Sequence, residues 1–332
     1  MCDEFISLTD HPLPTGIPTY GQHPDPHTLP SAAASLDYTV NSLLLSSLAP
    51  STLRAYRGSW QQLRAFTLEH TGQDTCLPVS TKLISRFIAS LHQKGFAPAT
   101  ITSKLSAVSF VHKLLSLPDP TQSFVTQKLL LAIRKNRIPD SWLPISPSIL
   151  KALIDSLPTL IAPNYDQILF KAMYLFAFYA MTRICEITVT SDSQHTLQLA
   201  NLHFRPSPNA PITVTFTTYK HSKPGRPATI AIQPQPGSKY CPVASMQDYL
   251  SLRGNCVGCL FLRSDGFPVP KDCFAKTLKT CLTYLGLNAQ NITPHSFRIG
   301  GATHAAQHGV PEALLRSIGR WSSSAYIQYI RP

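Results

Sequence analysis

Apolar residues recur every three or four positions along four stretches of the first half of the chain, which is the spacing of a buried helix face. Ser51 and Ser80 precede two of these stretches and are predicted to cap the helices, and Thr100 is predicted to open the third. The four predicted helices have apolar positions Leu53, Tyr56, Trp60, Leu63 and Phe66; Leu83, Ile84, Phe87, Ile88 and Leu91; Ile101, Leu105, Val108, Val111 and Leu115; and the run from Phe124 to Ile133. Together they predict a small all-helical domain over residues 36–135.

The pattern changes after residue 147 and mixes helices with strands. Two runs of alternating residues, 212–219 and 228–232, flank a Pro224-Gly225 turn and predict a β-hairpin. Helices are predicted at 148–157 and 168–181, after Pro242, from Asp272 and from Pro311. Residues 148–332 are therefore predicted to form a second domain, so that the fold class is mainly α with a small β-sheet.

Two segments outside these domains lack the regularly spaced apolar residues that would form a buried core. Residues 1–35 contain six prolines and no Lys or Arg, and they are predicted to be a disordered acidic leader. Residues 136–147 include Arg137 and several prolines, directly after Arg134 and Lys135. This composition predicts an exposed basic linker between the two domains.

The charge of the chain is uneven and narrows the classes of partner. The 332 residues carry 29 Lys and Arg against 17 Asp and Glu, and every basic residue lies at or after Arg54. Residues 1–53 therefore carry −5 and residues 54–332 carry +17. A folded body this basic indicates a polyanionic partner, with nucleic acid ahead of an anionic membrane surface.

Several classes of protein are excluded. The most apolar run, Ile168 to Met181, contains Lys171 and is shorter than the roughly 20 residues that span a bilayer. The N-terminus carries acids where a signal peptide needs basic residues. Eight cysteines at irregular spacing do not indicate a disulfide scaffold, so reduced thiols inside a cell are expected. Cys256 and Cys259 could begin a zinc site, but no second close pair completes four ligands, and free thiols are favoured.

Five side chains of the second domain form a candidate catalytic set. Taken singly, each has a simpler interpretation: Arg183 as an ion-pair partner of Glu186, and the late tyrosines as packing residues. Taken together, two arginines, a lysine, a histidine and a tyrosine are what phosphoryl transfer to a side-chain oxygen requires. Guanidinium groups suit non-bridging phosphate oxygens, a lysine can protonate a leaving oxygen, and a tyrosine can be the nucleophile. The set is Arg183, Lys220, His295, Arg298 and Tyr329.

The chain resembles the tyrosine recombinases, or phage-type integrases, and among them the recombinases of eukaryotic mobile elements of the DIRS and Crypton type. The helical domain is similar to the family's core-binding domain, and the second domain to its mixed α/β catalytic domain. Arg183 with Glu186 resembles the first Arg motif, although Ala180-Met181-Thr182 precedes it where relatives usually keep a glycine. Lys220 resembles the β-hairpin lysine. The resemblance implies that Arg183 stabilises the scissile phosphate, Glu186 orients a neighbouring group, and Lys220 protonates the leaving 5′ oxygen.

The C-terminal motifs extend the resemblance. His295 and Arg298 match the His-x-x-Arg box, Trp321 lies where the family has His or Trp, and Tyr329 in Gln-Tyr-Ile-Arg matches the nucleophile. Tyr329 is thus expected to form a 3′-phosphotyrosyl link, with Arg298 on the non-bridging oxygens and His295 and Trp321 adding hydrogen bonds. Trp321 and Tyr329 are one residue closer together than in many bacterial members, which leaves Tyr326 as a minor rival. Only three residues follow Tyr329, so the way subunits assemble is left open.

The same resemblance implies the partners. Double-stranded DNA is the expected substrate, bound by a homo-oligomer, a tetramer, without metal, ATP or other cofactor, because the covalent link stores the energy. The expected location is the nucleus in a eukaryote, and otherwise the cytoplasm with the DNA. The expected DNA contacts are Arg54, Arg57, Arg134, Lys135, Arg137 and Lys223.

Two other functions stay open at this point. One is a DNA-binding module, derived from such an enzyme, that no longer cuts; the filled catalytic positions argue against it. The other is a topoisomerase of the same chemistry, which would relax supercoils without a target sequence. Formation of a covalent DNA adduct separates the first from an enzyme, and dependence on DNA sequence separates the second from a recombinase.

Overall fold

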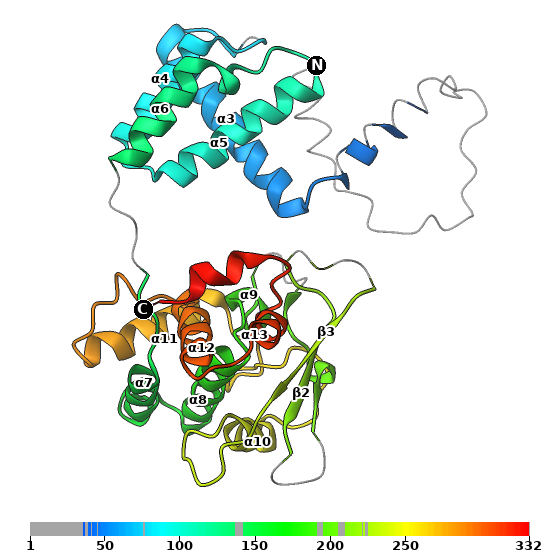
Figure 1. The fold of residues 1–332 in the computed structure, drawn as a ribbon, viewed down its shortest axis with the longest axis vertical. Coiled ribbons are helices and arrows are strands. Elements are labelled where there is room, and N and C mark those ends of the chain that lie inside the picture. Colours follow the sequence, from blue (N-terminus) through cyan, green and yellow to red (C-terminus); the bar gives the residue numbers. More distant parts are fainter. Residues whose placement is uncertain are drawn as a thin grey trace. The chain divides into compact units, whose positions relative to one another are not determined.

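The chain divides into two compact units, Met1–Pro139 and Asp140–Pro332 (Figure 1). The predicted leader, Arg137 and Lys223 lie outside the residues that the structure describes. The structure, a computed structural model, describes residues 36, 39–40, 42–44, 46–75, 77–136, 142–190, 195–204, 210–220, 222 and 225–331.

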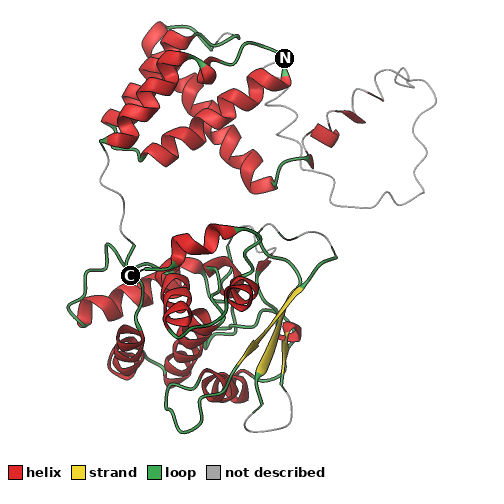
Figure 2. Cartoon of the chain, viewed as in Figure 1, coloured by secondary structure: helices red, strands yellow, loops and turns green. Residues whose placement is uncertain are grey.

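Packed α-helices build the first unit, as the apolar spacing predicts (Figure 2). They are α3 (Pro50–Thr71), α4 (Thr81–Gln93), α5 (Pro98–Leu114) and α6 (Phe124–Lys135), with a 3-10 helix, η1 (Pro120–Gln122), before α6. Helix α3 packs against α5, and α4 packs against both α5 and α6. Their inward faces bury one core, which includes Trp60, Leu63, Phe87 and Ile101.

The helix starts test the predicted caps. Ser80 caps α4, because its side chain accepts a hydrogen bond from the backbone N–H three residues later, so this prediction is confirmed. The predicted cap at Ser51 is wrong: α3 begins one residue earlier, at Pro50. A proline suits the first helical position because the N–H that it lacks would have no partner there. The same preference starts α5 at Pro98 instead of Thr100.

A buried helix, α8 (Asn164–Tyr179), lies in the middle of the second unit (Figure 1). It packs against α7 (Pro147–Leu160), α10 (Pro242–Arg253) and α12 (His295–Gln307). The prediction that this helix continues to Met181 is wrong by two residues. The remaining helices are α9 (Ile184–Ile187), α11 (Lys271–Tyr284) and α13 (Glu312–Gly319), with 3-10 helices η3 (Leu199–Asn201) and η4 (Ser324–Tyr329). Within the described ranges, every helix is too short or too polar to cross a bilayer.

A small antiparallel sheet covers one side of this unit, in the order β1-β2-β3. Its strands are β1 (Leu202–His203), β2 (Ile212–Phe216) and β3 (Ala228–Ile232). The hairpin of β2 and β3 is as predicted, but β2 ends at Phe216 instead of residue 219, because Phe216 pairs with Ala228, the first residue of β3. Lys220 therefore lies beyond the strand, in a turn closed by a 2.8 Å hydrogen bond from Ser222 N–H to the Tyr219 carbonyl.

Two glycines let α12 approach neighbouring backbone closely. A Cβ atom on Gly300 would lie 2.0 Å from the carbonyl oxygen of Ile145, and a Cβ atom on Gly301 would lie 2.1 Å from that of Phe178. Both distances are far below van der Waals contact. The absence of side chains at these positions therefore sets α12 against the end of α8, where the candidate site begins.

We expect Gly301→Ala to destabilise the second unit by about 3 kcal/mol, because the added methyl group must displace the α8 backbone. Gly58 in α3 gives the contrast: nothing lies within 4 Å of its Cβ position. Gly58→Ala is expected to stabilise the first unit by about 0.5–1 kcal/mol, through helix propensity. Chemical unfolding followed by circular dichroism measures both. Equal effects of the two substitutions would contradict the close approach at α12.

Candidate active site

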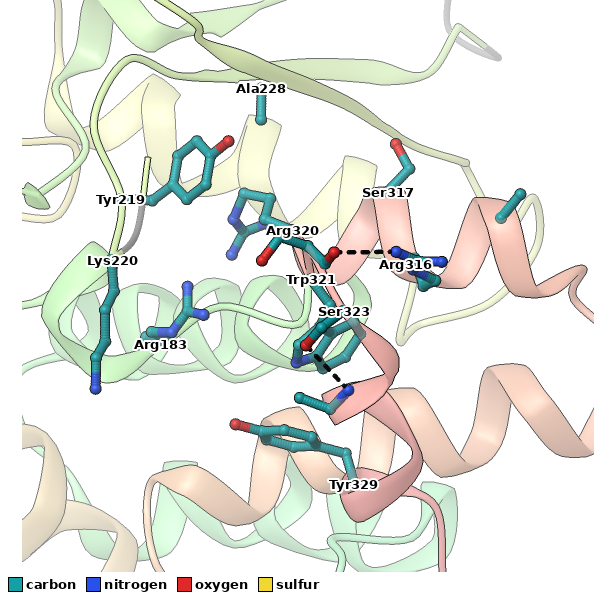
Figure 3. Close-up of a pocket in the computed structure, with 13 residues that line it drawn as sticks. Arg183, Tyr219, Lys220, Ala228, Arg316, Ser317, Arg320, Trp321, Ser323 and Tyr329 are labelled. Atoms are coloured by element: carbon teal, nitrogen blue, oxygen red, sulfur yellow. Dashed lines mark hydrogen bonds between the residues drawn. The ribbon is translucent and has the colours of Figure 1, made fainter. Parts of the chain in front are cut away.

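A cavity of about 840 Å³ opens in the second unit. Arg183, Lys220, Trp321 and Tyr329, four of the predicted site residues, line it, together with Arg320, which was not predicted as a site residue. Figure 3 shows the Tyr329 hydroxyl on the side of its ring that faces Arg183 and Lys220. Segments far apart in the sequence thus place a phenol, an amine and a guanidinium around one space.

Arg183 is held by the carboxylate of Glu186. The Arg183 backbone N–H donates to Glu186 Oε2 at 2.8 Å, and Arg183 Nη1 donates to Glu186 Oε1 at 3.2 Å. Glu186 is fully buried, whereas 17% of the Arg183 side chain stays exposed at the cavity. The ion pair predicted from the sequence is confirmed, and it leaves the guanidinium accessible to a ligand.

The turn before Arg183 contains a residue in the left-handed conformation, Met181. Met181 has φ 46°, a conformation that costs free energy for a residue with a side chain. This backbone reversal ends α8 and directs the chain into α9. The Met181 carbonyl accepts hydrogen bonds from the guanidinium groups of Arg298 and Arg320. Two buried arginines thus stabilise a turn that glycine would form without strain.

His295, the first residue of α12, lies beside the nucleophile candidate. Its ring is 5.2 Å from the Tyr329 ring, in an edge-to-face arrangement. The packing of protein around the imidazole, followed by the positive charges of Arg298, Arg183 and Arg331, lowers the pKa of His295 to about 4, although the residue as a whole is exposed. The imidazole is therefore neutral at pH 7 in the free protein.

This low pKa predicts a pH dependence of DNA binding. A phosphate in the cavity adds negative charge near His295 and raises its pKa, so the complex holds more protons than the free protein between pH 6.5 and pH 4. Affinity for a DNA duplex should therefore increase as the pH falls through this window, by at most about tenfold per pH unit. Fluorescence anisotropy measures the effect, and His295→Gln should remove it. A dependence that survives His295→Gln would assign the proton to another group.

Arg298 is placed differently from the expectation. Its side chain is fully buried, and it does not line the cavity. Its guanidinium donates to the carbonyls of Met181 and Gly319, the latter at 2.6 Å, and stacks 4.2 Å from the Trp321 ring. Burial, together with the nearby charges of Arg183 and Arg320, lowers the pKa of Arg298 to about 9, so the group is still protonated at pH 7. Contact with a phosphate stays a prediction for this residue.

Trp321 lines the cavity beside Tyr329, the candidate nucleophile. Its ring lies 5.0 Å from the Tyr329 ring, and the residue is buried, with 8% of its surface exposed. Gly319 makes this position possible, because a Cβ atom there would lie 1.7 Å from the indole. Among the described residues, the buried indole N–H of Trp321 has no hydrogen-bond partner. A buried donor of this kind is normally satisfied, so it suits an acceptor such as a phosphate oxygen.

The segment that carries Tyr329 is fastened to α12 of the same chain. The Thr303 hydroxyl donates to the Tyr329 carbonyl and accepts from the Arg331 N–H, both at 3.1 Å. Tyr326, the rival nucleophile, is buried and does not line the cavity. Enclosure by protein and the nearby negative charge of Glu312 raise the pKa of Tyr326, which disfavours its phenolate. The geometry thus favours Tyr329.

Arg320 belongs to the site although its sequence position alone assigns it no role. Its side chain is fully buried, and Nη2 forms a 2.6 Å ion pair with Glu186 Oε2. Its guanidinium also stacks 3.7 Å from the Phe216 ring of β2. The two charged residues are 134 positions apart. No local pattern pairs them, so only the tertiary structure could find this contact.

Cysteine and histidine side chains give little sign of a metal site. Among the residues that the structure describes, no three His, Cys, Asp or Glu side chains gather closely enough to hold a metal ion. Cys256 is exposed and Cys259 half-buried, and both are free thiols. The backbone of their loop is fixed by Arg253, which donates to the carbonyls of both cysteines.

The sequence and the fold of this chain are similar to those of known proteins. Residues 42–116 match the family described as "Phage integrase, N-terminal SAM-like domain". The Tn1549 transposon integrase in complex with circular intermediate DNA is 13% identical over 82% of this chain and 94% of that one, with a TM-score of 0.54. The fold is that of the tyrosine recombinases. No curated protein sequence matches the chain.

Two further solved structures share this tyrosine recombinase fold. A lambda integrase dimer bound to a COC′ core site is 14% identical over 90% of this chain and 77% of that one, with a TM-score of 0.59. The XerH site-specific recombinase bound to a palindromic difH substrate is 13% identical over 91% of this chain and 81% of that one, with a TM-score of 0.57. The predicted fold class is therefore confirmed. Kinship with DIRS and Crypton elements stays a prediction.

The predicted DNA contacts of the helical unit lie on α3 and α6. Arg54 is exposed and Arg57 half-buried on α3, and Lys135 is exposed at the end of α6. Arg134 lines a groove of about 310 Å³ and donates to the Thr102 hydroxyl at 3.2 Å. Contact of these residues with a phosphate backbone stays a prediction.

We expect the double variant Arg134→Ala with Lys135→Ala to flatten the salt dependence of DNA binding. Removal of one phosphate contact lowers the slope of log K against log salt by about 0.9, so removal of two lowers it by about 1.8. Titrations at several salt concentrations measure the slope. The control is Lys239→Ala, since that ammonium pairs with Asp155 at 3.0 Å in the second unit. The same slope in the double variant and the wild type would mean that neither linker-side charge touches DNA.

Proposed function

We propose that this chain is a site-specific recombinase that cuts and rejoins duplex DNA through a covalent link between Tyr329 and a 3′ phosphate. The observation that carries the proposal is the cavity in which the Tyr329 phenol faces Arg183 and Lys220. These are a nucleophile, a cation for the phosphate and an acid for the leaving oxygen. The tyrosine recombinase fold and the match of residues 42–116 support the same function.

The reaction follows from these groups. The phenol oxygen of Tyr329 attacks the phosphorus as its proton is released to solvent, and the P–O5′ bond breaks. Lys220 gives a proton to the departing 5′ oxygen, which becomes a hydroxyl. Arg183 and the unpaired indole N–H of Trp321 stabilise the charge on the non-bridging oxygens. Rejoining is the reverse, with a 5′ hydroxyl of the same or another strand as the attacking group.

This reaction requires no metal ion or nucleotide cofactor. The guanidinium of Arg183 and the ammonium of Lys220 supply positive charge at the phosphate, which is the electrostatic part that a bound metal would otherwise supply. The phosphotyrosyl bond keeps the energy of the broken diester, so rejoining needs no ATP.

The number of cuts indicates the assembly. Exchange between two duplexes breaks four strands, and each chain has one Tyr329 to hold one broken end. We propose that four copies act together on two DNA sites. We further propose that the chain is the recombinase of a eukaryotic mobile element and that it acts in the nucleus, where the DNA is.

A nicked duplex tests the function directly. A nick placed shortly to the 3′ side of the cut lets the short fragment with the free 5′ hydroxyl diffuse away. Rejoining is then impossible, so the covalent complex accumulates. Because the target sequence is unknown, the chain is incubated with random-sequence nicked duplexes in excess EDTA, and denaturation-resistant adducts are collected and sequenced. The expected result is an adduct on Tyr329, found by mass spectrometry, with a shared sequence in the attached DNA.

Other outcomes assign other functions. Cleavage that stops in EDTA and returns with magnesium would replace the tyrosine mechanism by that of a nuclease. Tight binding without any adduct would make the chain a DNA-binding module. Adducts with no shared sequence, together with relaxation of supercoiled plasmid, would make it a topoisomerase.

A further inference from the structure

Arg320 is the cavity residue to which the proposed reaction gives no role. Its side chain has no exposed surface, so it does not touch DNA in this conformation. Its two terminal nitrogens are both engaged: Nη1 donates to the carbonyls of Ile318 at 2.8 Å and Ala180 at 3.3 Å, and Nη2 donates to Glu186 and to the carbonyl of Met181. An arginine with this many internal contacts holds other groups in place.

The contacts of Arg320 lie on both sides of Arg183 in the sequence. Ala180 and Met181 belong to the strained turn that leads into Arg183, and Glu186 is the carboxylate that pairs with the Arg183 guanidinium. Arg320 comes from the other wall of the cavity, directly before Trp321. One side chain thus joins the wall that carries the phosphate-binding arginine to the wall that carries the nucleophile segment.

The backbone of Arg320 indicates that the side chain is needed at this position. Arg320 has φ 57° and ψ 45°, the left-handed conformation that ends many helices and that usually falls to glycine or asparagine. A large side chain is disfavoured there. Strained residues of this kind gather at functional sites, where the surrounding contacts hold them.

The charges explain what the contact does for Arg183. The Glu186 carboxylate has two cationic partners: Oε1 faces Arg183, and Oε2 accepts from the Arg183 backbone N–H and from Arg320. Without Arg320, the buried carboxylate would have a single cation left to neutralise it, and the Arg183 guanidinium would be drawn from the cavity onto Glu186. With Arg320 present, the charge of Arg183 remains available for a phosphate.

We propose that Arg320 is a positioning residue that holds Arg183 toward the cavity, through Glu186 and the Ala180–Met181 turn. The proposal rests on the proposed function, because it assigns to Arg183 the stabilisation of the scissile phosphate. Arg320 and Glu186 together hold Arg183 in place. Arg320 itself does not contact the reacting atoms.

The test compares two substrates that differ only in the charge of the scissile group. One nicked duplex carries the ordinary phosphodiester, and the other carries a methylphosphonate, in which a methyl group replaces one non-bridging oxygen. The neutral diester needs less stabilisation from Arg183. Arg320→Met should slow adduct formation about 100-fold on the phosphodiester, which is the effect of misplacing a catalytic group by about 1 Å. On the methylphosphonate the loss should fall below about tenfold.

Three further variants sharpen the result. Arg320→Met combined with Arg183→Ala should be no slower than Arg183→Ala alone, because the two residues act in series. Arg320→Lys keeps a cation at Glu186 but loses the fork, and it should lie between wild type and Arg320→Met on the phosphodiester. The control is Arg263→Met, which breaks a partly exposed 2.6 Å ion pair with Asp265 in the same unit and should match wild type on both substrates.

The outcomes are distinguishable. An equal loss on both substrates would show that Arg320 supports the fold as a whole, and it would overturn the proposal while leaving the recombinase function intact. Additive losses in the double variant would overturn it as well. If Arg320→Met does not fold, the same ratio of rates is measured for Arg320→Lys. Failure of the wild-type chain to form any adduct would instead reject the proposed function.

Discussion

Replacing Tyr329 by phenylalanine is expected to abolish the covalent protein–DNA adduct, a loss of roughly 10⁴-fold or more, because the substitution deletes the attacking oxygen. The ring remains, so its packing against Trp321 at 5.0 Å and His295 at 5.2 Å is kept, and the fold should be unchanged. DNA binding should persist at close to the wild-type affinity. Gel separation of denaturation-resistant complexes on the nicked duplex measures the adduct.

Tyr326→Phe is the matched control. Tyr326 lies in the same 3-10 helix, η4, but it is buried and does not face the cavity. The substitution removes only the Tyr326 hydroxyl, which the Glu312 carboxylate influences and which lies away from the proposed reaction. The variant should form the adduct at nearly the wild-type rate. An adduct that survives Tyr329→Phe and disappears with Tyr326→Phe would move the nucleophile three residues upstream.

The sequence predicts the helices of this chain well because their signals are local. An apolar residue every three or four positions records which face is buried, and Ser80 marks a helix start by its own side chain. Errors appear where two local signals compete, as at Pro50 against Ser51. They also appear where a partner strand decides, as in β2: the predicted strand runs to residue 219, but its ladder with β3 ends at the pair Phe216 and Ala228.

The candidate site shows a similar division. Arg183, Lys220 and Tyr329 are predicted from residue type and order, Trp321 is predicted from the family resemblance, and all four line one cavity. Burial could not be read from the same pattern, because every arginine near a motif has the same local signal whether it faces a ligand or a carbonyl group.

Two arginines illustrate this limit. Arg298 follows the motif but is turned to the carbonyls of Met181 and Gly319. Arg320, which the motif does not include, pairs with Glu186 across the fold. The long-range contacts that decide both orientations exist only in the folded chain. Resemblance to a family therefore names candidate residues, and the structure decides which of them the cavity presents.

Lys220→Ala is expected to slow cleavage severely, by about 10²–10⁴-fold, because the departing 5′ oxygen loses its proton donor. Lys220 lines the cavity with Arg183 and Tyr329, and its backbone lies in the turn closed by Ser222 and Tyr219. A general acid must come within about 2.6–3.2 Å of the oxygen that it protonates, and a residue in a hydrogen-bonded turn at the cavity is suited to reach that point.

A sulfur substitution at the leaving atom isolates this role. In a 5′-bridging phosphorothiolate the leaving group is a thiolate, which departs without a proton. This substrate should therefore restore cleavage by Lys220→Ala to near the wild-type rate, while it leaves Tyr329→Phe inactive. Lys223→Ala, the neighbouring lysine variant, should weaken DNA binding and show no rescue. Rescue of Lys223→Ala in place of Lys220→Ala would transfer the role of general acid to Lys223, and the absence of rescue for both would mean that Lys220 acts on the non-bridging oxygens instead.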